Sequence, residues 1–174
     1  MAPFRCSHAF RVRRLAFLCM LLLGACGSRA PRTQRMSSST PFIRASHLRF
    51  LQGDREYRFV GANLWYAVHL ASKGPGGDRA RLDRELDRLQ ALGLSNLRIM
   101  ASSEGSEGAL EQALPTMQPH PGQIDEAQLD GLDYLLQALA QRGMHAVVCL
   151  NNFWQWSGGF AQYLHWTGAG EIPY

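Results

Sequence analysis

The densest group of side chains that could bind a ligand lies between residues 151 and 166. Amides and large aromatic rings alternate there, beginning with Asn151, Asn152, Trp154 and Trp156. A flat indole can cover the C–H face of a sugar ring, and a nearby side-chain amide can hydrogen-bond to the sugar's hydroxyl groups. The pattern therefore indicates a carbohydrate-binding surface. Trp154 or Trp156 could equally pack beneath this loop as part of the core.

Two further groups of polar or aromatic residues follow apolar runs elsewhere in the chain. Asn63, Trp65 and Tyr66 come at or just after the end of the run 59–64, and Arg98 lies near the end of the run 94–100. Short apolar runs of this kind are typical of buried strands. If these strands are parallel, their carboxyl ends meet at one edge of a sheet, and all these side chains would gather there.

Other chemistries find little support in the sequence. The four histidines beyond residue 60 lack metal-ligand spacing, and no paired-cysteine motif occurs, so we predict no metal. The glycine-rich segment 74–77 contains Pro75, which lacks the amide that a phosphate loop needs, and we expect no nucleotide cofactor. Cys149 lies alone in an apolar run and is expected to be a small core residue.

The net charge of +4 comes entirely from the first 25 residues. That segment carries four arginines and no acid, and the remainder has 14 basic and 14 acidic side chains. This balance offers no electrostatic footprint for nucleic acid.

The same N-terminal segment predicts export. Residues 1–25 combine basic residues with an apolar run that is too short to span a membrane, as in a signal peptide. The ending Leu23-Gly24-Ala25-Cys26 resembles a bacterial lipobox, which implies a lipid anchor at Cys26 and attachment to the membranes of the cell envelope. The alternative is an ordinary secretory signal and a secreted protein. Residues 26–44 are predicted to form a linker.

The elements that must position the candidate residues follow from hydrophobic spacing. We predict a hairpin over 47–60 with its turn at 52–55, strands over 59–64, 94–100 and 145–150, and helices over 78–92 and 125–141. The last strand reads as buried on both faces. The long connection 101–124 lacks periodicity, which is unusual unless it serves a function.

Both predicted helices carry end signals. Asp78 is placed to cap the first helix and Gly93 to end it. Asp125 and Gln128 form a capping-box pair for the second helix. That helix is expected to bury four leucines, which are Leu129, Leu132, Leu136 and Leu139.

Strands alternating with helices predict parallel strands with crossover connections. An N-terminal hairpin and polar or aromatic residues at the strand ends favour a (β/α)8 barrel over an open sheet. Three strands cannot close such a barrel. We therefore expect residues 45–174 to be its N-terminal portion, comprising about three βα units plus the hairpin.

Several segments resemble endo-β-1,4-mannanases of glycoside hydrolase family 5, in the order in which that family has them. The resemblance covers about residues 45–170. Its segments are 59–66 (FVGANLWY), 92–98 (LGLSNLR), 121–126 (PGQIDE), 132–136 (LDYLL) and 142–159, where 151–159 (NNFWQWSGG) is the most diagnostic.

The family implies a retaining hydrolase of β-mannan with two catalytic glutamates. One of them lies in an Asn-Glu-Pro motif that ends the fourth strand, and the other ends the seventh. This chain contains neither strand and no Asn-Glu-Pro, so it is expected to be inactive alone. Glu104, Glu107 and Glu171 are expected to be solvated loop acids.

The resemblance also implies roles for residues that are present. Arg98 would be a buried cation that steadies the nucleophile and the sugar at the cleavage point. Either Trp65 or Tyr66 would wall a sugar subsite, and Asn63 would bond to the turn or to the ligand. Two alternatives remain open, a non-catalytic glycan-binding lipoprotein on a degenerate barrel and a related β-glucanase.

Overall fold

The computed structural model describes residues 42–105 and 113–172. The predicted signal peptide, Cys26, most of the predicted linker and Glu107 lie outside the described residues. Within the described part of the chain, no helix is both long and apolar enough to cross a membrane.

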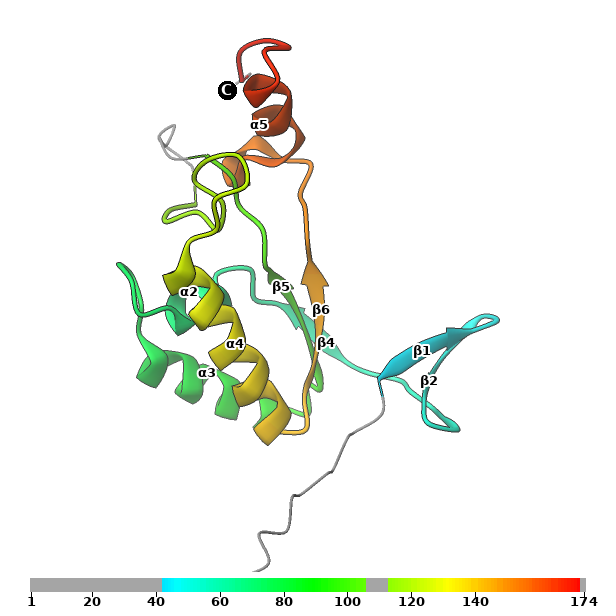
Figure 1. Ribbon diagram of the computed structural model, residues 1–174. Coiled ribbons are helices and arrows are strands. Elements are labelled where there is room, and N and C mark those ends of the chain that lie inside the picture. The colour runs from blue at the N-terminus through cyan, green and yellow to red at the C-terminus, as the bar shows by residue number, and fades with distance from the viewer. Residues whose placement is uncertain (1–41, 106–112, 173–174) are drawn as a thin grey trace, which may run out of the picture. The chain divides into compact units, whose positions relative to one another are not determined.

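A three-stranded parallel sheet forms the centre of the described residues (Figure 1). Its strands are β4 (Gly61–Asn63), β5 (Asn96–Met100) and β6 (His145–Cys149), in that order. Helices α2 (Ala67–Ala71), α3 (Arg79–Ala91) and α4 (Glu126–Gln141) connect the strands and lie on one side of the sheet. The predicted alternation of parallel strands and crossover helices is confirmed.

Side chains of the helices and the sheet form one core between them. Its largest almost completely buried side chains are Leu82, Leu86, Leu97, Ile99, Leu135 and Leu139. The opposite face of the sheet is more open, since Val147 of β6 is 48% exposed. The prediction that this strand is buried on both faces is therefore wrong for the described residues, because the helices cover only one face.

The helix ends follow the sequence signals closely. The Asp78 carboxylate accepts a hydrogen bond from the Arg81 N–H at 2.8 Å, and Gly93 has the positive φ of 81° expected after a helix end. The Asp125 carboxylate likewise accepts from the N–H groups of Ala127 and Gln128. A capping box also requires the Asp125 N–H to donate to the Gln128 side chain. That part of the prediction is wrong, because the Asp125 N–H donates to the Met117 carbonyl at 2.9 Å instead.

The buried face of α4 differs from the predicted leucine stripe. Leu139 is buried and Leu132 is partly buried, but Leu129 and Leu136 are each 39% exposed. The face is set by Gly131, where an added Cβ would lie 2.8 Å from the Val68 carbonyl oxygen of α2. This close approach rotates the two exposed leucines away from the core.

The N-terminal segment forms a separate antiparallel sheet of three strands. They are β1 (Ile43–Ser46), β2 (Arg49–Gln52) and β3 (Arg55–Glu56). The turn predicted at 52–55 joins β2 to β3. Strand β1 was not predicted and begins two residues inside the predicted linker, while the second strand of the predicted hairpin ends early, at Glu56.

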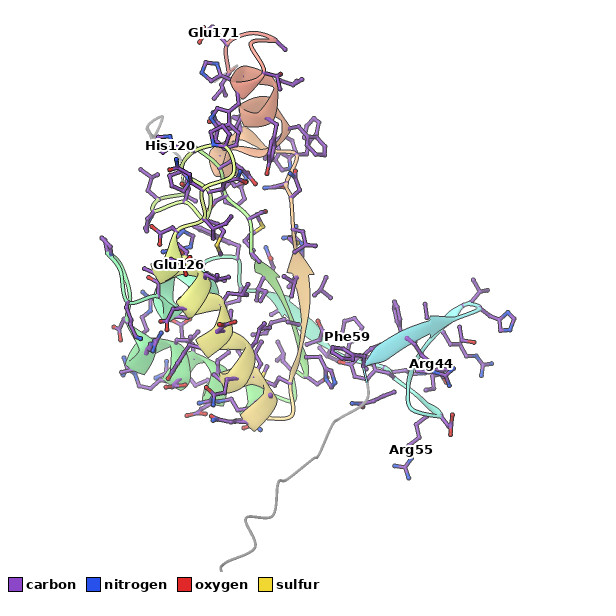
Figure 2. The ribbon with its side chains drawn as sticks, viewed as in Figure 1. Arg44, Arg55, Phe59, His120, Glu126 and Glu171 are labelled. Carbon is purple, nitrogen blue, oxygen red and sulfur yellow. The ribbon has the colours of Figure 1, made fainter. Side chains whose placement is uncertain are left out.

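The small sheet contacts the amino-terminal ends of β5 and β6. The Tyr57 ring stacks on Phe59 at 5.4 Å between centroids and lies 5.0 Å from the His145 ring. The Asn96 amide donates to the Tyr57 hydroxyl at 3.3 Å, and the Gln52 amide nitrogen lies 3.1 Å from His145 Nε2. Figure 2 shows Phe59 at this junction. These contacts cover the end of the sheet opposite to the candidate site.

Candidate functional site

The candidate site begins with a polar pair at the carboxyl end of the sheet. Asn63 and Arg98 are register partners on neighbouring strands, and Arg98 Nη1 donates to Asn63 Oδ1 at 3.2 Å. The Leu64 N–H donates to the Arg98 carbonyl at 2.9 Å, which fixes the chain just after β4. The side-chain amide of Asn63 therefore has a protein partner.

Arg98 differs from its expected environment. Its side chain is exposed rather than buried, and it forms no ion pair with any acid of the described residues. Its position in β5 alternates with that of Leu97 and Ile99, which face the helices and are fully buried. The guanidinium is thus directed to the face of the sheet that the helices do not cover.

Trp65 and Tyr66 meet edge-on, with ring centroids 5.6 Å apart, but they have different partners beyond each other. The Trp65 ring is 38% exposed and lies 5.3 Å from the Trp156 ring, with an interplanar angle of 70°. The Tyr66 hydroxyl instead donates to the Glu85 carboxylate of α3 at 3.0 Å. Burial and the neighbouring Glu85 raise the pKa of Tyr66. Trp65 is consequently the ring available to a ligand, and Tyr66 anchors the chain to α3.

His69 supports Trp65 from α2, a role that sequence reasoning missed. The two rings are 6.2 Å apart, and His69 Nε2 lies 3.0 Å from the Pro115 carbonyl oxygen. Burial lowers the pKa of His69, although the Pro115 carbonyl partly opposes this effect. The neutral imidazole then carries its proton on Nε2. Because Trp65 precedes α2 and the Pro115 carbonyl comes from a distant loop, no local spacing in the sequence predicted this contact.

The loop after β6 provides the opposing ring. It contains the short helix η1 (Gln155–Ser157) and leads into α5 (Gly159–Trp166). Asn152 holds this loop from within, since its amide donates to Ser157 Oγ at 2.9 Å and its Oδ1 accepts from the Phe153 N–H at 2.9 Å.

The remaining predicted residues of this loop differ in exposure. Asn151 is exposed, Trp154 is 58% exposed and Trp156 is half-buried. Trp154 is therefore not a core residue of the described structure. Trp156 both packs beneath the loop and contributes to the candidate surface, because one part of its ring is covered while the ring still faces Trp65.

A shallow pocket of about 660 Å³ lies beside this loop. Its lining includes Phe153, Gln155, Phe160, Leu164 and Glu171. The Phe153 ring meets the Phe160 ring edge-on at 6.2 Å. Because the pocket depends on how α5 folds back on the loop, the sequence pattern did not reveal it.

Glu104 is buried, which corrects the expectation of a solvated loop acid. Only 2% of the residue is exposed, whereas the side chain of Glu171 is 96% exposed, as expected. Burial raises the pKa of Glu104, and hydrogen bonds from the Gly159 N–H and the Tyr163 hydroxyl oppose that rise. Loop composition alone could not reveal this burial, because it depends on contacts with residues more than 50 positions away.

No cation site emerges from the described ranges. Within residues 42–105 and 113–172, no group of three histidine, cysteine, aspartate or glutamate side chains is arranged to hold a metal ion. The Trp65 and Trp156 rings can stack on a ligand, and the Asn63 and Arg98 side chains lie at the same end of the sheet with polar groups for hydrogen bonding.

Comparison with known proteins shows which family this chain resembles in sequence and in structure. A family model described as GH family 5 beta-mannosidase-like matches residues 40–174. A glycoside hydrolase family 5 mannosidase from Rhizomucor miehei is 42% identical and superposes with a TM-score of 0.72, covering 76% of this chain and 33% of that one. A variant from the same organism, solved in complex with mannosyl-fructose, gives 42% identity, a TM-score of 0.71 and the same coverage.

A plant relative gives the same picture. Mannan endo-1,4-beta-mannosidase 5 of Solanum lycopersicum is 27% identical over 143 residues, which is 82% of this chain and 32% of that protein. The chain thus spans about a third of the length of these relatives. The family 5 enzymes that it superposes on are (β/α)8 barrels, so the predicted fold class is confirmed.

Proposed function

Because the chain belongs to the beta-mannosidase-like proteins of glycoside hydrolase family 5, we propose that its protein hydrolyses internal β-1,4-mannosidic bonds of mannans with retention of configuration. Two relatives support the substrate class. One is named a mannan endo-1,4-beta-mannosidase, and the other was solved with a mannose-containing sugar.

The observation that carries the proposal is the pairing of Trp65 with Trp156. Two indoles from different loops meet at the carboxyl end of the sheet, next to the Asn63–Arg98 pair. Such a corner presents apolar ring surface beside amide and guanidinium donors, which suits a sugar with C–H faces and hydroxyl rims. We propose that it forms one wall of the mannan groove.

We further propose that the two catalytic carboxylates lie outside these 174 residues. Retaining hydrolysis needs two carboxyl groups about 5–5.5 Å apart that face the same sugar. At this end of the described structure, Glu104 is covered by its own loops and Glu171 extends into solvent. Neither is presented to a sugar on the Trp65–Trp156 wall.

The test compares hydrolysis of β-1,4-mannohexaose by the 174-residue chain and by the protein extended through the downstream coding sequence. We expect no new reducing ends from the chain, and retained configuration in the products of the extended protein. Hydrolysis of mannohexaose by the 174-residue chain would refute the placement of the carboxylates, and Glu104→Gln and Glu171→Gln would show whether either of these acids is responsible.

The same assay separates the alternative functions. If the extended protein hydrolyses cellohexaose in preference to mannohexaose, it is a β-glucanase and not a mannanase. If it binds mannohexaose without cleaving it, the protein is a glycan-binding member of the family. Arg98→Ala in the extended protein is expected to reduce the hydrolysis rate.

A further inference from the structure

The loops that follow β5 and β6 are joined to each other by backbone hydrogen bonds. The Glu104 N–H donates to the Ser157 carbonyl at 2.9 Å, and the Ala113 N–H donates to the Trp156 carbonyl at 2.8 Å. Both loops lie at the end of the sheet to which β5 and β6 point (Figure 1). The backbone of Trp156 is therefore held by the other loop, not by its own strand.

The Glu104 side chain adds further hydrogen bonds to this junction between the two loops. Its Oε2 accepts a hydrogen bond from the Gly159 N–H, the first residue of α5, at 2.9 Å. The Tyr163 hydroxyl, one turn further along α5, lies 3.3 Å from Oε1 and also 3.2 Å from Gln118 Oε1. One buried carboxylate thus ties the loop after β5 to the start of the helix that follows Trp156.

The glycines beside this carboxylate fit the same arrangement. An added Cβ at Gly158 would lie 2.3 Å from the Glu104 carbonyl oxygen, and Gly158 has a φ of +84°. An added Cβ at Gly159 would lie 2.5 Å from the Asn152 carbonyl oxygen. Gly158 therefore lets the chain approach Glu104 more closely than a residue with a side chain could, and Gly159 lets α5 begin close to the backbone of its own loop.

We propose that Glu104 is a positioning residue for glycan binding, which holds the loop after β6 so that the Trp156 indole faces Trp65. The expected effect on glycan binding rests on the proposed function, whereas the expected effect on the order of the loop does not. Glu104 acts through Trp156 and does not contact the sugar. Its burial, its contacts with Gly159 and Tyr163, and the glycine pair together carry the argument.

The experiment uses the 174-residue chain and two readouts. Amide hydrogen exchange follows Gly159 and Ala113, and tryptophan fluorescence titration measures β-1,4-mannohexaose affinity. Glu104→Ala is expected to speed exchange at both amides and to weaken the affinity about tenfold, the scale of losing a hydrogen bond to a charged group. Glu104→Gln keeps an oxygen for the Gly159 N–H and should restore most of the protection and affinity. Glu126→Gln, at an exposed position on α4 (Figure 2), should change neither readout.

Two glycine substitutions, one at the junction and one as a matched control, test the same junction without altering the carboxylate. Gly158→Ala should reproduce the exchange and affinity changes of Glu104→Ala. Gly93→Ala has a similar positive φ but nothing within 4 Å of the new Cβ, so it should leave the junction unchanged. Unaltered exchange at Gly159 and Ala113 in both Glu104→Ala and Gly158→Ala would overturn the proposal.

The two proposals fail in different ways. If the wild-type chain shows no mannohexaose affinity, the proposed mannan wall at Trp65 and Trp156 is wrong, while the exchange data still decide whether Glu104 orders the loop. If mannohexaose binds and Glu104→Ala binds it equally well, the positioning role is wrong and the proposed function stands.

Discussion

Glu104 gives the clearest residue-scale consequence, a pH dependence of stability. Burial raises its pKa above the ordinary value of 4.5, and the Tyr163 hydroxyl that faces it has a raised pKa too and stays neutral. The native state therefore binds this proton more tightly than the unfolded state does. The stability that Glu104 contributes is fully present below its unfolded pKa and is lost as pH rises through its native pKa.

The prediction is made for Glu104→Gln, which cannot ionise. The melting temperature of the wild type relative to this variant should fall as pH is raised from about 4 to about 7. Thermal unfolding of both proteins in the same series of buffers measures the difference and cancels the titration of all other groups. A relative melting temperature that rises with pH would show that the ionised form is the stabilising one.

At the residue scale, the sequence predicted which residues gather but not how each one is oriented. Asn63, Trp65, Arg98 and Trp156 were expected at one edge, and the structure brings them there. The separate directions of Trp65 and Tyr66 depend on the Glu85 carboxylate, which belongs to another helix. No local pattern contains that information.

At the scale of elements, helices α3 and α4 are joined by Arg142. Its guanidinium donates to Asp87 at 2.7 Å, to Asp83 at 3.2 Å and to the Ala138 carbonyl at 3.0 Å. The Tyr134 hydroxyl of α4 donates to the same Asp83 at 2.7 Å. The Arg142 side chain is 14% exposed, so these bonds are partly shielded from water.

We expect Arg142→Ala to lower the free energy of unfolding by about 1.5–3 kcal/mol, the range for hydrogen bonds to charged groups. Arg84→Ala, at an exposed position on α3, should change it by less than about 0.5 kcal/mol. Urea denaturation measures both variants. Equal unfolding midpoints for the two would contradict a joining role for Arg142.

The helices illustrate what hydrophobic periodicity can and cannot predict. It located α3 and α4 to within a residue, because capping residues and leucine spacing are local properties. It assigned Leu129 and Leu136 to the wrong face of α4. The buried face is decided by the close approach of α2 at Gly131. A single glycine in the sequence does not predict such a tertiary contact.

At the scale of the whole molecule, the described residues form a core on one side of a three-stranded parallel sheet. The order of strands and helices, read from the sequence, was sufficient to predict part of a (β/α)8 barrel, and the structural neighbours confirm it. The junction between the loops after β5 and β6 could not be predicted, since it pairs residues more than 40 positions apart through their backbones.

The central claim is that Trp65 and Trp156 form a wall for mannan. Its most direct test is calorimetric titration of the 174-residue chain with β-1,4-mannohexaose, using Trp156→Ala and Tyr66→Phe as a contrasting pair. We predict measurable binding that Trp156→Ala weakens about tenfold, equivalent to about 1.4 kcal/mol, and that Tyr66→Phe leaves unchanged because this hydroxyl bonds to Glu85. Absence of binding, or equal affinity in the wild type and Trp156→Ala, would contradict the claim.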